Sequence, residues 1–170
     1  MREASALWTA VLRNGLLLIV PPMVITFALW PHLPAAYGAE AFDRDVAGWL
    51  LATENVLRLA AFALPLFLYF GRESRLQAAG WYVYVIGIFL YLGSYMAQIY
   101  LPASPWSSGV LGFTAPAWST LFWFVGIALV CENTWLPWPW HRAVYLVVAT
   151  AFVVFHVAHA CVVFLRHTPA

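Results

Sequence analysis

The stretch AVYLVVATAFVVFHVAHACVVFL, residues 143–165, decides the fold class of this protein. It contains no Asp, Glu, Lys or Arg over its whole length. An α-helix needs about 20 predominantly apolar residues to cross the hydrocarbon core of a bilayer. We therefore expect this stretch to span a membrane as a helix, although it carries His156 and His159.

Four further stretches of similar length and composition precede it, at about residues 7–30, 46–70, 80–101 and 109–131. The segments between them are short and rich in the prolines and glycines that are typical of turns. The sequence therefore predicts an all-α membrane protein. We expect a bundle of five transmembrane helices that forms a single integral membrane domain over residues 1–170.

The composition of the whole chain supports this class. Of the 170 residues, 64% are apolar and only 9% are charged, and the mean hydropathy is +0.82. A soluble domain of this size needs far more charged side chains on its surface. A formal net charge of +1, with no glycine-rich phosphate loop, excludes nucleic-acid binding and nucleotide-driven activity. Membrane lipid is the expected partner, and the oligomeric state stays open.

The arginines predict the orientation, because cytoplasmic loops retain positive charge. With the N-terminus inside, five arginines would be cytoplasmic and two would lie outside, so we expect a cytoplasmic N-terminus and an outer C-terminus. The absence of Lys, typical of GC-rich bacterial genomes, favours a bacterial cytoplasmic membrane.

The first stretch could also be a cleaved signal peptide, but Pro21 and Pro22 fit cleavage poorly, and we expect a span kinked at these prolines.

Ionisable residues inside membrane spans mark candidate functional sites. The second span contains Glu54, Asn55 and Arg58, and the fifth contains His156 and His159. At a rise of about 1.5 Å per residue, Glu54 lies about 12 Å from the outer end of its span. The fifth span runs the opposite way, which puts His159 and His156 about 9 and 13 Å from the outer end. We expect the carboxylate and both imidazoles to meet in one layer.

The third span adds Tyr91, Tyr95 and Gln98 on one helical stripe in the same outer half, and Trp118 of the fourth span falls at a matching depth. We predict a polar-lined cavity in the outer half of the membrane, closed toward the cytoplasm by apolar packing.

Two features concern helix packing. Gly80, Gly87 and Ser94 give the third span a small-residue face on which a neighbouring helix can approach closely. Pro65 in the second span frees the carbonyl of Ala61 as a further acceptor.

The first functional hypothesis is a small integral-membrane enzyme that uses acid-base chemistry on an apolar, lipid-like substrate such as an isoprenoid or a sterol-like molecule. Glu54 would move the proton, Arg58 would tune Glu54, and a histidine, His156 or His159, would be the complementary acid or base. The residues expected to contact this substrate are Asn55, Tyr91, Tyr95, Gln98 and Trp118.

Two alternatives belong to other classes. In the first, the protein is a non-catalytic membrane subunit or ligand-binding protein, and the polar layer only fastens the helices. In the second, Glu54, His156 and His159 bind a metal ion as two histidines and one carboxylate, in a metal-dependent membrane oxidoreductase. The enzyme hypothesis needs no cofactor.

PPMVITFALWPHLP, residues 21–34, and ENVLRLAAFALPLF, residues 54–67, resemble the emopamil-binding-protein and sigma-2-receptor (EXPERA) family. TAPAWSTLF, residues 114–122, resembles that family's last helix, and the resemblance covers about a third of the chain. Members of this family are small endoplasmic-reticulum proteins that bind sterol-like amines, and some isomerise sterol double bonds. Here the family's first-helix acid is missing from Thr26 to Trp30, and members of this size have four helices. The resemblance therefore implies only a lipid-accessible pocket for an apolar molecule, with Glu54 as the acid that faces it.

Overall fold

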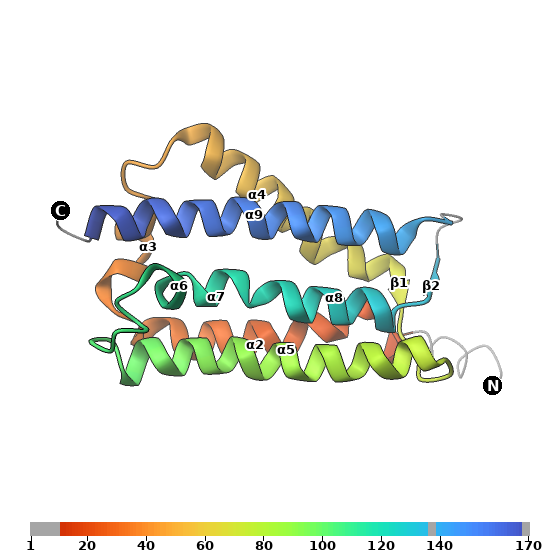
Figure 1. The fold of residues 1–170 in the computed structure, drawn as a ribbon. Coiled ribbons are helices and arrows are strands. Elements are labelled where there is room, and N and C mark those ends of the chain that lie inside the picture. The colour runs from red at the N-terminus through yellow and green to blue at the C-terminus, as the bar shows by residue number, and fades with distance from the viewer. Residues whose placement is uncertain (1–10, 136–138, 168–170) are drawn as a thin grey trace.

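The computed structural model describes residues 11–135 and 139–167 of the chain. The main helical segments run alternately in opposite directions along one bundle, in which α5 packs on α8 and α4 crosses α9 (Figure 1). The elements, with η for 3-10 helices, are η1 (Gly15–Ile19), α2 (Val20–Leu29), η2 (Trp30–His32), η3 (Ala35–Tyr37), α3 (Ala39–Asp43), α4 (Gly48–Ala63), η4 (Leu64–Phe67), β1 (Leu68–Tyr69), α5 (Arg75–Tyr100), α6 (Val110–Phe113), α7 (Ala115–Trp118), α8 (Thr120–Val130), β2 (Asn133–Thr134) and α9 (His141–His167).

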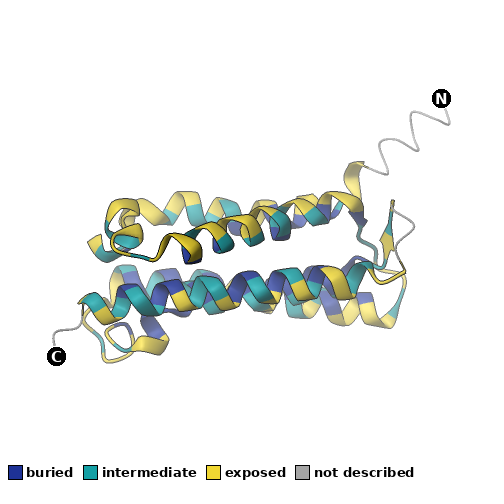
Figure 2. Cartoon of the chain, turned by 90° about the horizontal axis from the view of Figure 1, so that it is seen from above, coloured by how far each residue is buried: buried dark blue, intermediate teal, exposed yellow. Residues whose placement is uncertain are grey.

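Within the described residues, four helical segments are long and apolar enough to cross a membrane: Gly15–His32, Gly48–Phe67, Arg75–Tyr100 and His141–His167. Their outward faces are exposed and carry many large apolar side chains, as a surface in contact with lipid requires (Figure 2). The prediction of an all-helical membrane protein is confirmed. The predicted cytoplasmic position of the N-terminus stays a prediction.

The span expected over residues 109–131 is not one continuous helix but three short ones, α6, α7 and α8. The break follows from Pro116, because proline has no N–H to donate to the carbonyl of Gly112. Gln98 of α5 replaces that donor, since its Nε2 lies 2.8 Å from the Gly112 oxygen. Taken together, α7 and α8 form an apolar helical stretch, Ala115–Val130, that is shorter than the four long segments.

Prolines also set the ends of two other helices. Pro21 and Pro22 occupy the first turn of α2, where a missing N–H is tolerated, and the 3-10 helix η1 precedes them. The expected kink inside the first span is therefore a change from 3-10 to α-helix. In the second span the α-helix ends at Ala63 instead of continuing to residue 70, because Pro65 follows and η4 and β1 replace the last turns.

The tightest packing joins α5 to α8. A Cβ added to Gly87 would lie 2.5 Å from the backbone nitrogen of Trp123, and one added to Gly80 would lie 2.7 Å from the Cβ of Leu129. The predicted small-residue face of α5 is confirmed, and α8 is the neighbour that uses it. Trp123 and Ile127 of α8 are fully buried in the resulting apolar core.

Candidate functional site

Glu54 of α4 lies between the two histidines of α9, in the layer that the depth comparison predicted. Its carboxylate is 1% exposed. Oε1 lies 2.9 Å from Nδ1 of His156, and Oε2 lies 2.6 Å from Nδ1 of His159. Arg58, one turn further along α4, donates a hydrogen bond from Nη2 to Oε1. The four side chains therefore form one connected group across the contact between α4 and α9.

The hydrogen bonds of His159 fix where its protons are. Its Nε2 lies 3.0 Å from the carbonyl oxygen of Phe42, and a carbonyl can only accept, so Nε2 carries a hydrogen. The 2.6 Å contact between Nδ1 and Glu54 Oε2 must then contain a second proton, on either the imidazole or the carboxyl group. Wherever that proton lies, Glu54 and His159 together carry no net charge.

His156 is held differently. Its Nδ1 faces Glu54 Oε1, an oxygen that already accepts from Arg58, so Nδ1 carries a hydrogen, and in the neutral ring the lone pair is then on Nε2. Nε2 has no hydrogen-bond partner among the described residues. The ring stacks on Phe152, with centroids 5.3 Å apart and planes 12° from parallel, which fixes its orientation. A carboxylate thus sets the tautomer of an imidazole whose second nitrogen is free.

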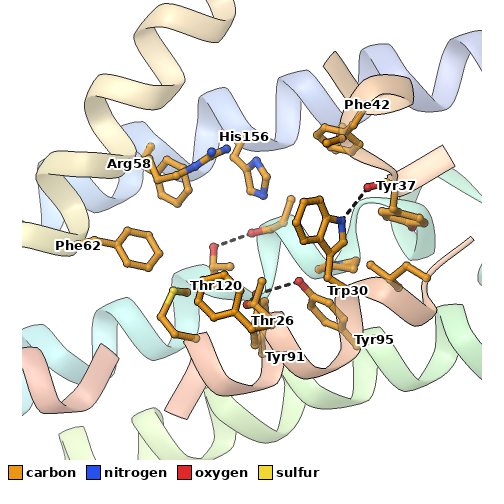
Figure 3. A pocket seen from close by; sticks show the side chains of 18 of the residues that line it. Thr26, Trp30, Tyr37, Phe42, Arg58, Phe62, Tyr91, Tyr95, Thr120 and His156 are labelled. Carbon is orange, nitrogen blue, oxygen red and sulfur yellow. Dashed lines mark hydrogen bonds between the residues drawn. The ribbon is translucent and has the colours of Figure 1, made fainter. Parts of the chain in front are cut away.

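A cavity of about 610 Å³ adjoins this group, a volume within the usual range of small-molecule sites. Arg58 and His156 lie along one side of it, and Thr26, Tyr91 and Tyr95 lie on the other (Figure 3). Most of the lining is apolar. The hydroxyls of the far side are largely satisfied by one another, since the Tyr91 hydroxyl lies 2.7 Å from that of Thr26 and 3.1 Å from that of Tyr95.

The cavity opens sideways, between α2 and α4. Phe27 of α2 and Leu59 of α4 both line it, yet they are 70% and 72% exposed. Both belong to segments that are long and apolar enough to cross a membrane. The opening therefore lies between exposed apolar faces of two segments that could cross a membrane, where an apolar molecule could enter.

The structure divides the predicted site residues into two sets. The residues that line the cavity are Asn55, Arg58, Tyr91, Tyr95 and His156. Glu54 and His159 lie behind this lining. Gln98 and Trp118 do not line the cavity, because each satisfies a carbonyl near the break in the fourth span. Gln98 donates to Gly112, and Trp118 Nε1 donates to the Leu111 oxygen at 2.9 Å.

Sequence reasoning missed the contribution of α3. It follows the first span, in the segment between the first two predicted spans, and it folds back over the histidines. Phe42 packs its ring on His159, with centroids 4.4 Å apart, and its backbone oxygen accepts from Nε2. The only signal in the sequence is one aromatic residue between the acidic residues Glu40 and Asp43.

Trp123 is a second residue that was missed. It lines the cavity and is fully buried, and its indole N–H has no acceptor among the described residues. A buried donor without a partner is unfavourable by about 1–3 kcal/mol.

In the part of the chain that the structure describes, the arrangement of the side chains does not match the metal hypothesis. No group of three His, Cys, Asp or Glu side chains there is placed to hold a metal ion. The reason is visible at Glu54, where Nδ1 of both histidines lies at hydrogen-bond distance from a carboxylate oxygen. These nitrogens and oxygens face one another instead of a shared central point.

The fold and its exposed apolar faces define a helical integral membrane protein. No protein-family model, curated protein or solved structure matches the chain.

Proposed function

We propose that this protein is a small membrane enzyme that moves a proton on an apolar, lipid-dissolved molecule, with His156 as the base. The observation that carries the proposal is the placement of the His156 ring. Nδ1 is bound to a buried carboxylate, Nε2 has no partner among the described residues, and the ring lines a cavity whose opening lies between exposed apolar side chains. An imidazole held in this way can accept a proton at Nε2.

Glu54 acts through His156 in this proposal and does not meet the substrate itself. It is 1% exposed and is not among the residues that line the cavity. A carboxylate behind an imidazole fixes its tautomer and stabilises the positive charge that forms when the ring takes a proton. This refines the hypothesis from the sequence, in which Glu54 moved the proton directly.

The reaction needs no oxidant, reductant or second substrate. His156 takes a proton from one atom of the bound molecule and returns a proton to another, which shifts a double bond and leaves the composition unchanged. An apolar lining favours this chemistry because it excludes water from the charged intermediate. The resemblance of residues 54–67 to the EXPERA family agrees with a lipid-accessible pocket for an apolar molecule.

Solvent deuterium tests the proposal whatever the identity of the substrate. Membranes that contain the protein are incubated in D₂O, and their extracted lipids are screened by mass spectrometry for deuterium that does not wash out in H₂O. We expect the wild-type protein to label at least one lipid species at carbon, and His156→Ala to abolish the labelling. The matched control is His167→Ala on the same helix, which removes an exposed imidazole that does not line the cavity.

Two results contradict the proposal. One is the absence of stable deuterium in every lipid when the wild-type protein is folded, and the other is equal labelling by the wild type and His156→Ala. Either result favours the non-catalytic alternative, in which Glu54 only fastens α4 to α9. In that case His156→Ala would lower the free energy of unfolding and change nothing else.

A further inference from the structure

The charges around Glu54 do not cancel. Glu54 and His159 are neutral as a pair, because a proton lies in the contact between them. His156 is neutral when its Nε2 carries a lone pair. The guanidinium of Arg58 therefore adds one positive charge that no described side chain of this group offsets.

Two further charged side chains flank α3 at the rim of this group. The carboxylate of Asp43 lies 3.8 Å from His159 Nε2, and Arg166 donates to the carbonyl oxygens of Ala41 and Phe42 at 3.1 and 3.2 Å. Asp43 also lines the cavity, but its side chain is 63% exposed and its ion-pair partner among the described residues is His159, not Arg58. One positive charge remains on a helix that can cross a membrane, where an uncompensated charge is unfavourable.

Arg58 also has hydrogen-bonding capacity to spare. A guanidinium has five N–H groups, and among the described residues only Glu54 and Asn55 accept from it. The amide nitrogen of Asn55 has no acceptor among those residues either. Both side chains line the cavity, and the Arg58 side chain is 44% exposed. Several donors that can converge on one small anionic group therefore lie beside His156.

We propose that the cavity binds a single-chain amphiphile with one carboxylate head group, which lies on Arg58 and Asn55, and a hydrocarbon tail that leaves between Phe27 and Leu59. The inference rests on the proposed function, since it names the class of molecule beside the His156 base. A planar guanidinium matches a carboxylate in a two-pronged contact. A carboxylate carries one negative charge, whereas a phosphate monoester carries about −1.5 to −2 at neutral pH and would overcompensate Arg58.

Binding of tritiated oleate to the protein in phosphatidylcholine nanodiscs tests this inference, with empty nanodiscs as the background. Oleyl alcohol has the same tail and a neutral head, and hexadecyl phosphate tests the charge argument. We expect saturable binding of about one oleate per protein, and affinities for oleyl alcohol and hexadecyl phosphate at least tenfold weaker. Arg58→Gln should weaken oleate binding at least tenfold and leave oleyl alcohol binding unchanged. The control is Arg13→Gln, which removes an exposed arginine paired with Glu73.

Two further variants keep the test decisive if Arg58→Gln does not fold. Arg58→Lys retains the charge and should keep the preference for oleate over oleyl alcohol. Leu59→Trp adds bulk at the exposed opening and should slow oleate entry at least tenfold without changing helicity. Equal binding of oleate and oleyl alcohol, or tighter binding of hexadecyl phosphate than of oleate, overturns the inference. Because the readout is binding and not turnover, head-group selectivity can hold while deuterium labelling fails, and the reverse, so the two proposals fail separately.

Discussion

Replacing Glu54 by Gln and by Ala separates the charge of this side chain from its hydrogen bonds. A Gln at this position keeps the shape, its carbonyl oxygen can accept from Arg58 and His156, and its N–H can donate to the lone pair of His159 Nδ1. An Ala removes every acceptor at once. The comparison therefore asks whether the group is held by paired hydrogen bonds or by charge.

The contacts of Glu54 give the expected changes in the free energy of unfolding. In Glu54→Gln the bond from Arg58 loses its charged acceptor, a loss of about 1 kcal/mol, because the hydrogen bond itself is kept and the Arg58 side chain is 44% exposed. In Glu54→Ala the buried His159 and the partly buried His156 both lose their acceptor, at about 1–3 kcal/mol each, and a void forms. We expect Glu54→Ala to lower the free energy of unfolding by about 4 kcal/mol, roughly 3 kcal/mol more than Glu54→Gln.

Reversible unfolding by sodium dodecyl sulfate in mixed micelles, followed by circular dichroism and tryptophan fluorescence, measures these differences. Glu73→Ala is the control, because it breaks an exposed pair with Arg13 and should change the free energy of unfolding by less than about 1 kcal/mol. In the deuterium assay Glu54→Gln should stay folded but label lipid about 10²–10⁴-fold more slowly, since a neutral amide cannot stabilise the protonated His156 ring. Equal stability of the Gln and Ala variants would refute the paired arrangement.

Four further predictions concern the scaffold and use the same unfolding assay. Gly87→Ala should lower the free energy of unfolding by about 1–3 kcal/mol, because the new Cβ meets the backbone of α8. Gly93→Ala, which meets nothing within 4 Å, should raise it by about 0.5–1 kcal/mol. Gln98→Leu should lower it by about 1–3 kcal/mol, because a carbonyl freed by proline loses its donor. The hydrogen bond from Ser74 holds the pKa of Glu132 below its usual value. Glu132 therefore stabilises the fold above the unfolded-state pKa of about 4.3, and the difference between wild type and Glu132→Gln should vanish as the pH falls below the lowered value.

The contact between Glu54 and the histidines could be predicted from the sequence because helix geometry is uniform. A fixed rise per residue and antiparallel neighbours convert positions along two spans into depths, and residues at one depth can meet. The small-residue face of α5 could also be predicted from the sequence, since Gly80 and Gly87 recur at a spacing that keeps them on one side of the helix.

The break in the fourth span could not be predicted from hydropathy. Residues 109–131 are apolar enough for a continuous helix, but hydropathy does not record which carbonyls have a donor. Pro116 removes the donor of Gly112, and the replacement comes from Gln98, a residue of another helix. The depth comparison put Gln98 and Trp118 in the same half of the bundle as the cavity. Both side chains, however, donate hydrogen bonds to backbone carbonyls and do not line the cavity.

His156 and His159 show why the roles of two identical side chains cannot be separated from sequence alone. Both bind the same carboxylate through Nδ1 and lie three residues apart on one helix. They differ in what the second nitrogen faces: for His159 it is the backbone oxygen of Phe42, whereas for His156 it is the cavity. A backbone oxygen has no sequence signature, and its position depends on the fold of α3. Because Nε2 of His159 must keep its hydrogen to satisfy that oxygen, only His156 can offer a lone pair to a molecule in the cavity.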